Sequence, residues 1–239
     1  MSENVTAEQI ASTIGLEAIP ENVRSLTSLV SRQDAPMQDI AKLICANKEL
    51  TSRLLRAANP RAASEDDYTV TSVDAALMRA GVGCALLLAM SDPLIRAVKR
   101  TFETMIGVDL RDCAPGVLVP LEKEHVIGEV AFAGKATGCV NLRLSPASAG
   151  GIASTVLGFP AEDPADISDV IGELGNMVVG NFKSNLCDAG LTCKLSPPKI
   201  SRTQEFRLRA VGGGLAERTG FRGSDIEIFV DILVNPWND

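Results

Sequence analysis

The stretch 164-PADISDVIGELGNMVVGNFKSNLCD-188 contains the most informative pattern in the chain. Its apolar residues recur every three or four positions, which predicts one long amphipathic helix. With Ile167 at zero and an advance of about 100° per residue, the apolar stripe centres roughly 20° short of zero. The stripe is made of Ile167, Val170, Ile171, Leu174, Met177 and Val178. This face is expected to pack against a core.

A second set of residues on this helix is turned away from the stripe. Between roughly 180° and 240° lie Asp169, Glu173, Asn176 and Gly180, which we call the polar ridge. By spacing alone, such a ridge is most simply a solvated surface. The alternative is a functional site formed by a carboxylate and a carboxamide three residues apart.

Three glycines, Gly172, Gly175 and Gly180, lie in the same predicted helix. Each lowers helix stability by ~1 kcal/mol relative to alanine, so each suggests that something approaches the backbone closely. Gly172 and Gly180 lie near the polar ridge, which favours contact with a partner. Gly175 lies nearer the core side, which favours packing.

The residues from 91 onward predict an α+β domain with an antiparallel sheet and two long helices. Ser91-Asp92-Pro93 is typical of a helix start, with Asp92 as the cap and proline in the first turn. Residues 137–144 and 226–234 alternate between apolar and polar types, as strands do. For residues 137–144 the alternation predicts one buried face and one exposed face, and residues 126–132 are expected to form the preceding strand.

Residues 1–90 show helical periodicity instead, with short loops between short segments, and predict a compact all-α bundle. We therefore divide the chain into a helical region, 1–90, and an α+β domain, 91–239. The expected buried stripes of the bundle include Val23, Leu26, Ile40, Ile44, Leu50, Leu54, Val73, Ala76, Leu77 and Ala80.

Composition excludes several classes of function. The chain has 239 residues, 30 acidic against 23 basic, and a net charge of −7. No basic run is present, which argues against nucleic-acid binding. The longest apolar stretch, residues 82–90, is about half a membrane span, so no membrane association is expected. The opening residues lack the basic and apolar parts of a secretory signal, and a cytoplasmic location with free thiols is expected.

Histidine and cysteine usage limits the possible catalytic and metal sites. The six cysteines form no CxxC pair, so a thiolate zinc site is not indicated. His125 is the single histidine, and any Ser-His-Asp triad, Cys-His dyad or histidine metal site would have to use it. Its place just before a strand-like run indicates a surface-loop residue. Catalysis would then depend on carboxylates, amides or the groups of a partner, and no metal site is predicted.

From Asp92 onward the chain resembles the CheX branch of the CheC/CheX/FliY phosphatases. The matching parts are DPLIRAVKRTFETMIGV as the opening helix, GCVNLRLSPASAGGIASTVLG as a strand–helix unit and DVIGELGNMVVGNFKSNL as the signature helix. Asp169, Glu173 and Asn176 occupy the D-x-x-x-E-x-x-N positions. KLSPPKI follows as the next strand, with Pro198 at about the distance where the family pattern has its proline.

The resemblance implies a phosphatase that acts on the phosphorylated aspartate of a CheY-like receiver in two-component or chemotaxis signalling. Asn176 would orient the attacking water, and Glu173 would pair with the receiver's lysine. The receiver would supply Mg²⁺, so the chain itself would bind no cofactor. Asp169, Gly172, Gly180 and Lys183 would be partner-binding residues, and a homodimer is possible, because the family includes dimers.

About residues 16–90 resemble the beginning of an HDOD domain and cover less than half of a usual one. The pieces are AIPENVRSLTSLV, MQDIAKLICANKELTSRLLRAANP and TSVDAALMRAGV. No histidine precedes residue 125, so the ligands of a metal-dependent HD phosphohydrolase are missing, and the segment is expected to regulate or pack. A non-catalytic adaptor that binds a receiver or another signalling protein remains the alternative function, followed by a flagellar-switch scaffold component.

Overall fold

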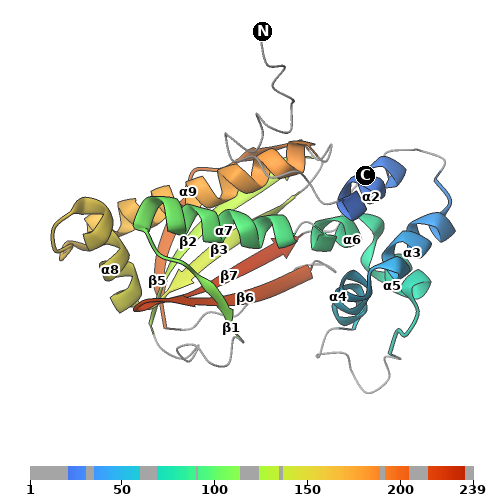
Figure 1. The fold of residues 1–239 in the computed structure, drawn as a ribbon, viewed down its shortest axis with the longest axis horizontal. Helices are drawn as coiled ribbons and strands as arrows, with labels where there is room; N and C mark the ends of the chain where they lie inside the picture. The colour runs from blue at the N-terminus through green and yellow to red at the C-terminus, as the bar shows by residue number, and fades with distance from the viewer. Residues whose placement is uncertain are drawn as a thin grey trace, which may run out of the picture.

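A computed structural model of the chain describes residues 21–30, 35–59, 69–89, 91–113, 124–134, 137–188, 192–204 and 215–234. A helical bundle lies beside a larger part in which three helices cover one face of a sheet (Figure 1). The predicted α+β class, with helices first and an antiparallel sheet after them, is confirmed.

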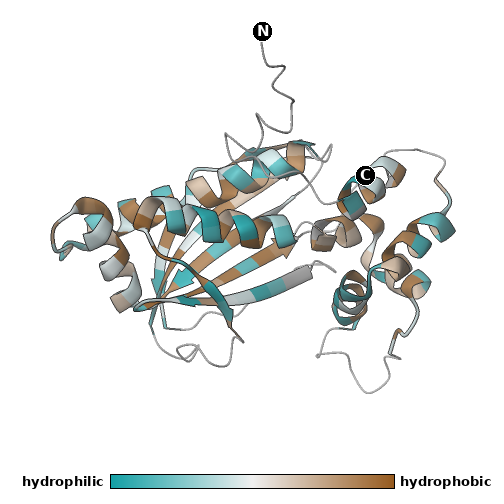
Figure 2. Ribbon diagram, in the orientation of Figure 1, coloured by the Kyte–Doolittle hydropathy of each residue, from teal (hydrophilic) through white to brown (hydrophobic). Residues whose placement is uncertain are grey.

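In the described residues the bundle has five short helices, whose predicted apolar stripes are buried. They are α2 (Glu21–Val30), α3 (Met37–Ala46), α4 (Lys48–Ala58), α5 (Val73–Ala80) and α6 (Val82–Ala89). Side-chain caps begin two of them, because Asn47 accepts a hydrogen bond from the Leu50 N–H and Ser72 accepts one from the Ala75 N–H. Helix α6 is apolar nearly all round, as its brown colour in Figure 2 shows, and its described side chains are mostly buried.

The second part is a seven-stranded antiparallel sheet covered by α7 (Ser91–Ile106), α8 (Pro146–Leu157) and α9 (Pro164–Asp188) (Figure 1). Its strands lie in the order β1 (Arg111–Cys113), β6 (Leu215–Gly223), β7 (Ile226–Val234), β3 (Gly138–Leu144), β2 (His125–Gly134) and β4 (Cys193–Leu195), and β5 (Lys199–Thr203) also pairs with β2.

Helix α9 packs its apolar stripe on the central strands of this sheet. The Phe182 and Phe132 rings meet edge to face with centroids 6.2 Å apart. A Cβ at Gly175 would lie 3.5 Å from Val130, so the glycine lets the helix lie close to β2. The predicted packing role of Gly175 agrees with this contact, and the arrangement leaves the opposite side of α9 outermost.

The expectation of one exposed face on residues 137–144 is wrong. Asn141 and Arg143 in β3 are both buried, and Asp231 in β7 is fully buried next to them. The Arg143 guanidinium lies 4.7 Å from the centroid of the Phe229 ring. Burial lowers the pKa of Arg143 to about 10, although Asp231 opposes this shift. The polar residues that alternate with apolar ones in β3 therefore belong to a buried polar region and not to a solvated surface.

The expectation for His125 is also wrong. The histidine is the first residue of β2 and is 1% exposed, so it does not lie in a surface loop. The strand begins one residue earlier than the apolar run at residue 126 suggests, because the ladder with β5 already includes the pairing of His125 with Thr203.

One buried arginine joins the bundle to the α+β part. Arg53 in α4 is 8% exposed; its Nε donates to Glu217 of β6 at 2.7 Å and its Nη1 to Asp92 of α7 at 3.2 Å. Burial alone lowers the pKa of Arg53, but the carboxylates of Glu217, Asp92 and Glu49 together outweigh it and the pKa is raised. Asp92 was expected to cap α7; it lies in the first turn instead, and its carboxylate pairs with Arg53.

Candidate functional site

The candidate site is the outer surface of α9, where the polar ridge lies. Asp169 and Glu173 are exposed, and Asn176 is half-buried one helical turn after Glu173. Three residues along a helix correspond to an axial rise of about 4.5 Å, so the carboxylate and the carboxamide start from neighbouring positions on one face. The bundle does not cover this surface.

The polar groups of the ridge are uncommitted. Within the described part of the chain, neither Glu173 nor Asn176 makes a hydrogen bond or an ion pair through its side chain. The Asn176 amide therefore keeps both its donors and its acceptor for another molecule. Glu173, when ionised, can accept a charge-assisted hydrogen bond from a cation outside the chain.

The three glycines of α9 have different surroundings. Gly172, expected near the partner-facing ridge, is buried: a Cβ there would lie 3.5 Å from the Pro198 ring. Gly175 packs on the sheet, as described above. A Cβ at Gly180 would have no atom of the described residues within 4 Å. Among the three, Gly180 alone has no described neighbour where a Cβ would lie.

Pro198 reaches α9 because of an irregular edge of the sheet. Leu195 pairs with Phe132 of β2, whereas Lys199 pairs with Glu129, so one extra residue lies between the two pairings, as in a β-bulge. Ser196 fixes the segment: its N–H donates to the Ala131 carbonyl at 2.9 Å and its hydroxyl accepts from the Ala131 N–H at 3.0 Å.

The bulge places the Pro198 ring against Gly172, on the turn of α9 that precedes Asn176. It also divides the single strand expected from KLSPPKI into β4 and β5. The sequence signal for the interrupted strand is the pair Pro197-Pro198, since neither residue can donate to a ladder.

Lys183 lies two turns after Asn176 and is half-buried. Burial raises the pKa of the Cys193 thiol at the start of β4, and the positive charge of Lys183 opposes this rise. The lysine is thus located beside the C-terminal half of the ridge rather than among Asp169, Glu173 and Asn176.

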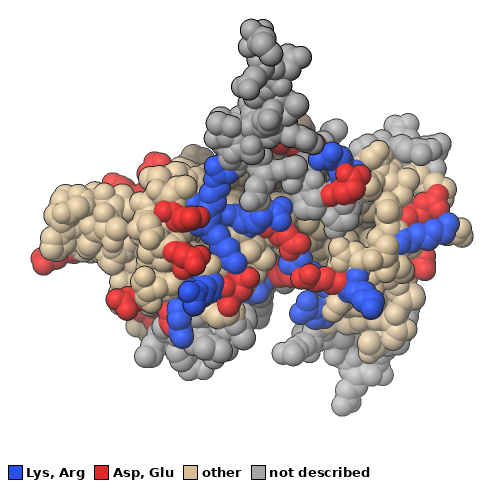
Figure 3. Space-filling model, viewed as in Figure 1, with Lys and Arg blue, Asp and Glu red and all other residues tan. Residues whose placement is uncertain are grey.

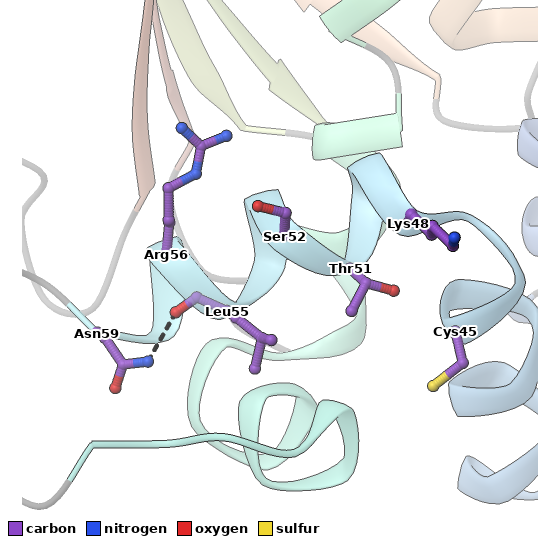
Figure 4. A pocket seen from close by; sticks show the side chains of 7 residues that line it. All are labelled: Cys45, Lys48, Thr51, Ser52, Leu55, Arg56 and Asn59. Atoms are coloured by element: carbon purple, nitrogen blue, oxygen red, sulfur yellow. Dashed lines mark hydrogen bonds between the residues drawn. The ribbon is translucent and has the colours of Figure 1, made fainter.

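A hollow of about 800 Å³ in the bundle offers a weaker candidate. Figure 4 shows that its side chains point to different sides of α4, with Arg56 and Ser52 on one side and Thr51 and Leu55 on the other. Asn59 is committed to the backbone of Leu55 and Val70. No polar groups converge on one point. The hollow is lined by Cys45, Lys48, Thr51, Ser52, Leu55, Arg56 and Asn59.

Charge does not distinguish another surface on the face drawn in Figure 3, where basic and acidic side chains are interspersed. In the part of the chain that the structure describes, no group of three or more His, Cys, Asp or Glu side chains could hold a metal ion. Among the same residues no single helix is long and apolar enough to span a membrane. The segments Val73–Ala80 and Val82–Ile106 have that length and apolar character only when taken together, and the pair is bent by 107°.

Comparison with known proteins agrees with this architecture. Residues 126–216 match the family model described as chemotaxis phosphatase CheX, and residues 16–112 match the HDOD domain. The HDOD match includes α7, which the sequence division at residue 90 assigned to the second domain; the position of the boundary stays a prediction. No curated protein matches the chain.

Solved chemotaxis proteins share the fold. A putative chemotaxis protein from Desulfovibrio vulgaris Hildenborough and CheX from Vibrio vulnificus each have 20% identity and a TM-score of 0.53, covering 61% of this chain and 96% of theirs. The CheX–CheY–BeF3–Mg²⁺ complex from Borrelia burgdorferi includes a chain with 22% identity and a TM-score of 0.50, covering 61% of this chain and 97% of that one. The chain is thus similar to a CheX-type domain over residues 126–216 and to an HDOD domain over residues 16–112.

Proposed function

We propose that the chain removes the phosphoryl group from the phosphorylated aspartate of a CheY-like receiver, with the polar ridge of α9 as the catalytic surface. The observation that carries the proposal is that Glu173 and Asn176 lie one turn apart on the outer side of α9, uncovered by the bundle and uncommitted to other described residues. The CheX family match and the fold shared with a CheX–CheY complex support it.

Asn176 enters the receiver's phosphorylated pocket and holds a water in line with the acyl phosphate. The water oxygen bonds to phosphorus while the bond from phosphorus to the aspartate oxygen breaks. The products are inorganic phosphate and the free carboxylate, and the water's proton passes to phosphate or solvent. Such a reaction depends on positioning and electrostatics more than on a protein nucleophile, so it suits a surface without histidine.

Glu173 pairs with the receiver's lysine and fixes the register of the complex. An ionised carboxylate suits this role, because it is an acceptor only and bonds strongly to an ammonium group. The receiver brings the Mg²⁺ that neutralises the phosphoryl oxygens. Asp169, one turn before Glu173, contacts the rim of the receiver, and a chemotaxis pathway is the setting.

The experiment measures loss of acyl phosphate from phosphorylated receivers encoded by the same genome, with Mg²⁺, in the presence of the full chain. The wild type should accelerate it. Asn176→Ala should lose most of the acceleration, roughly 100-fold by analogy with removal of one transition-state hydrogen-bonding group, while binding survives. Glu173→Ala should weaken the acceleration through misplacement.

Asn181→Ala is the matched control for Asn176→Ala. Asn181 is an exposed asparagine on the same helix, but its amide is directed to Thr101 of α7. The control should keep wild-type activity. Equal decay rates with wild type and Asn176→Ala would contradict the phosphatase and support the non-catalytic adaptor.

A further inference from the structure

Gly180 is the one glycine of α9 for which the described structure gives no packing reason. A Cβ at Gly172 would touch Pro198, and a Cβ at Gly175 would touch Val130, each at 3.5 Å. At Gly180 no atom of a described residue would lie within 4 Å. A glycine in a helix interior is less stable than alanine, so the open position weakens α9 with no compensating contact inside the described chain.

The position of Gly180 relates it to the catalytic pair. It lies four residues after Asn176, which corresponds to about 6 Å along the helix axis, and on the same polar ridge. The residue is half-exposed, and its carbonyl accepts a hydrogen bond from the Ser184 hydroxyl at 3.3 Å. A partner that encloses Glu173 and Asn176 extends over this turn as well, because a protein domain is far wider than one helical turn.

We infer that the receiver's main chain crosses α9 at Gly180, and that the missing side chain lets it approach the helix backbone closely enough for Asn176 to reach the phosphoryl group. This inference rests on the proposed function, which puts the receiver on the ridge. It adds how far the contact extends: the receiver reaches along α9 from Glu173 and Asn176 past Gly180, toward Lys183.

A side chain at position 180 holds the receiver away from the ridge. One added carbon projects on the order of 1.5 Å from the backbone, one carbon–carbon bond length. A misplacement of about 1 Å can lower a reaction rate on the order of 100-fold. Removing the glycine is therefore expected to change stability and function in opposite directions, which a purely structural role does not produce.

The test compares Gly180→Ala and Gly180→Gln with the control Gly151→Ala in the full chain. Gly151 in α8 is exposed, has no atom of a described residue within 4 Å of a built Cβ, and its carbonyl accepts from Thr155 at 2.9 Å. Helix α8 lies at the end of the molecule where α9 begins, away from the C-terminal half of α9 (Figure 1).

Three quantities are measured: the melting temperature, the Kd for a receiver activated with beryllofluoride and Mg²⁺, and kcat and KM for the phosphorylated receiver. Both alanine variants should melt about 2–4 °C higher. Gly180→Ala should weaken binding and kcat/KM about tenfold or more, and Gly180→Gln should weaken them further. Gly151→Ala should leave both unchanged.

A Gly180→Ala chain that melts higher and binds the activated receiver as tightly as wild type overturns the inference. So does a wild-type chain that does not bind the activated receiver. If wild type binds without hydrolysis, the phosphatase proposal fails, but the Kd still decides this inference: weakening confined to the Gly180 variants supports the contact, and unchanged affinity overturns it.

Discussion

The buried side chains of the helical bundle are nearly all apolar, whereas those of the α+β part include several polar and charged groups. Arg53 is the one buried charge among the described residues of α2–α6, and it points out of the bundle to Asp92 and Glu217. On the far side of the sheet, Arg143 and Asp231 are fully enclosed.

This difference separates polar groups that hold the fold from those available for chemistry. Asp231 is fully buried but bound through both oxygens to Arg218, at 2.5 and 3.0 Å. Glu173 and Asn176, in contrast, are accessible and make no side-chain bond to a described residue. In this molecule a buried charge therefore serves the fold, and the pair that we propose for catalysis is the one on the outside of α9 with no side-chain bond to a described residue.

The largest loss of stability is expected from Asp231→Ala, which tests the polar interior of the sheet. The substitution leaves the cations Arg218 and Arg143 without this carboxylate, and removing one partner of a buried ion pair typically destabilises a protein by about 3–5 kcal/mol. Urea unfolding should show a loss of that size. Asp39→Ala in the bundle removes an exposed pair with Lys42 and should cost less than about 1 kcal/mol. Similar small losses for both variants would contradict the contrast drawn here.

The contact between the two regions can be tested through Arg53→Met. The arginine is buried, but Asp92 is half exposed, so we expect a smaller loss of about 1.5–3 kcal/mol, the range for hydrogen bonds to charged groups. Combined with Glu217→Gln, the variant should show a coupling energy above about 0.5 kcal/mol in a double-mutant cycle. The control Arg56→Met, at an exposed position on the same helix, should show none. Strict additivity for Arg53 and Glu217 would mean that the ion pair does not join the regions.

The reactivity of cysteine thiols offers a comparison between the interiors of the bundle and of the α+β part, and this test has little effect on stability. Burial raises the pKa of Cys84 in α6 to about 12 and, with Glu129 and Asp231 contributing, that of Cys139 in β3 to about 11. At pH 8 a pKa near 12 lowers the thiolate fraction about 1000-fold relative to a thiol at 9.0. The exposed Cys45 should react first with an aromatic disulfide reagent, and Cys84 should become faster as the pH rises. Mass spectrometry of the labelled sites reads the order; early labelling of Cys84 would contradict its burial.

Helical periodicity predicted the bundle and α9 well, because a helix with one apolar stripe has one way to bury it. Ile44, Leu54, Ala76 and Leu77 are all essentially inaccessible, as expected. The exposed position of Glu173 likewise follows from the angle between ridge and stripe.

The alternation of apolar and polar residues predicted exposure wrongly where polar residues pair with one another inside the protein. Nothing local in the sequence shows that Arg143 stacks on Phe229 or that His125 is enclosed, since both environments come from strands distant in the chain. The pairing of Asp231 with Arg218 lies within one hairpin, but it depends on the register of β6 and β7. The contact of Pro198 with Gly172 also depends on a bulge opposite β2, which proline spacing alone does not reveal.

The most direct test of the central claim is a crystal structure of the full chain bound to a receiver activated with beryllofluoride and Mg²⁺. The account predicts that the Asn176 amide faces the beryllofluoride group, with Glu173 within 4 Å of the receiver's lysine ammonium and the receiver main chain over Gly180. A complex in which the receiver binds the helical bundle, with the outer side of α9 left in solvent, would contradict it.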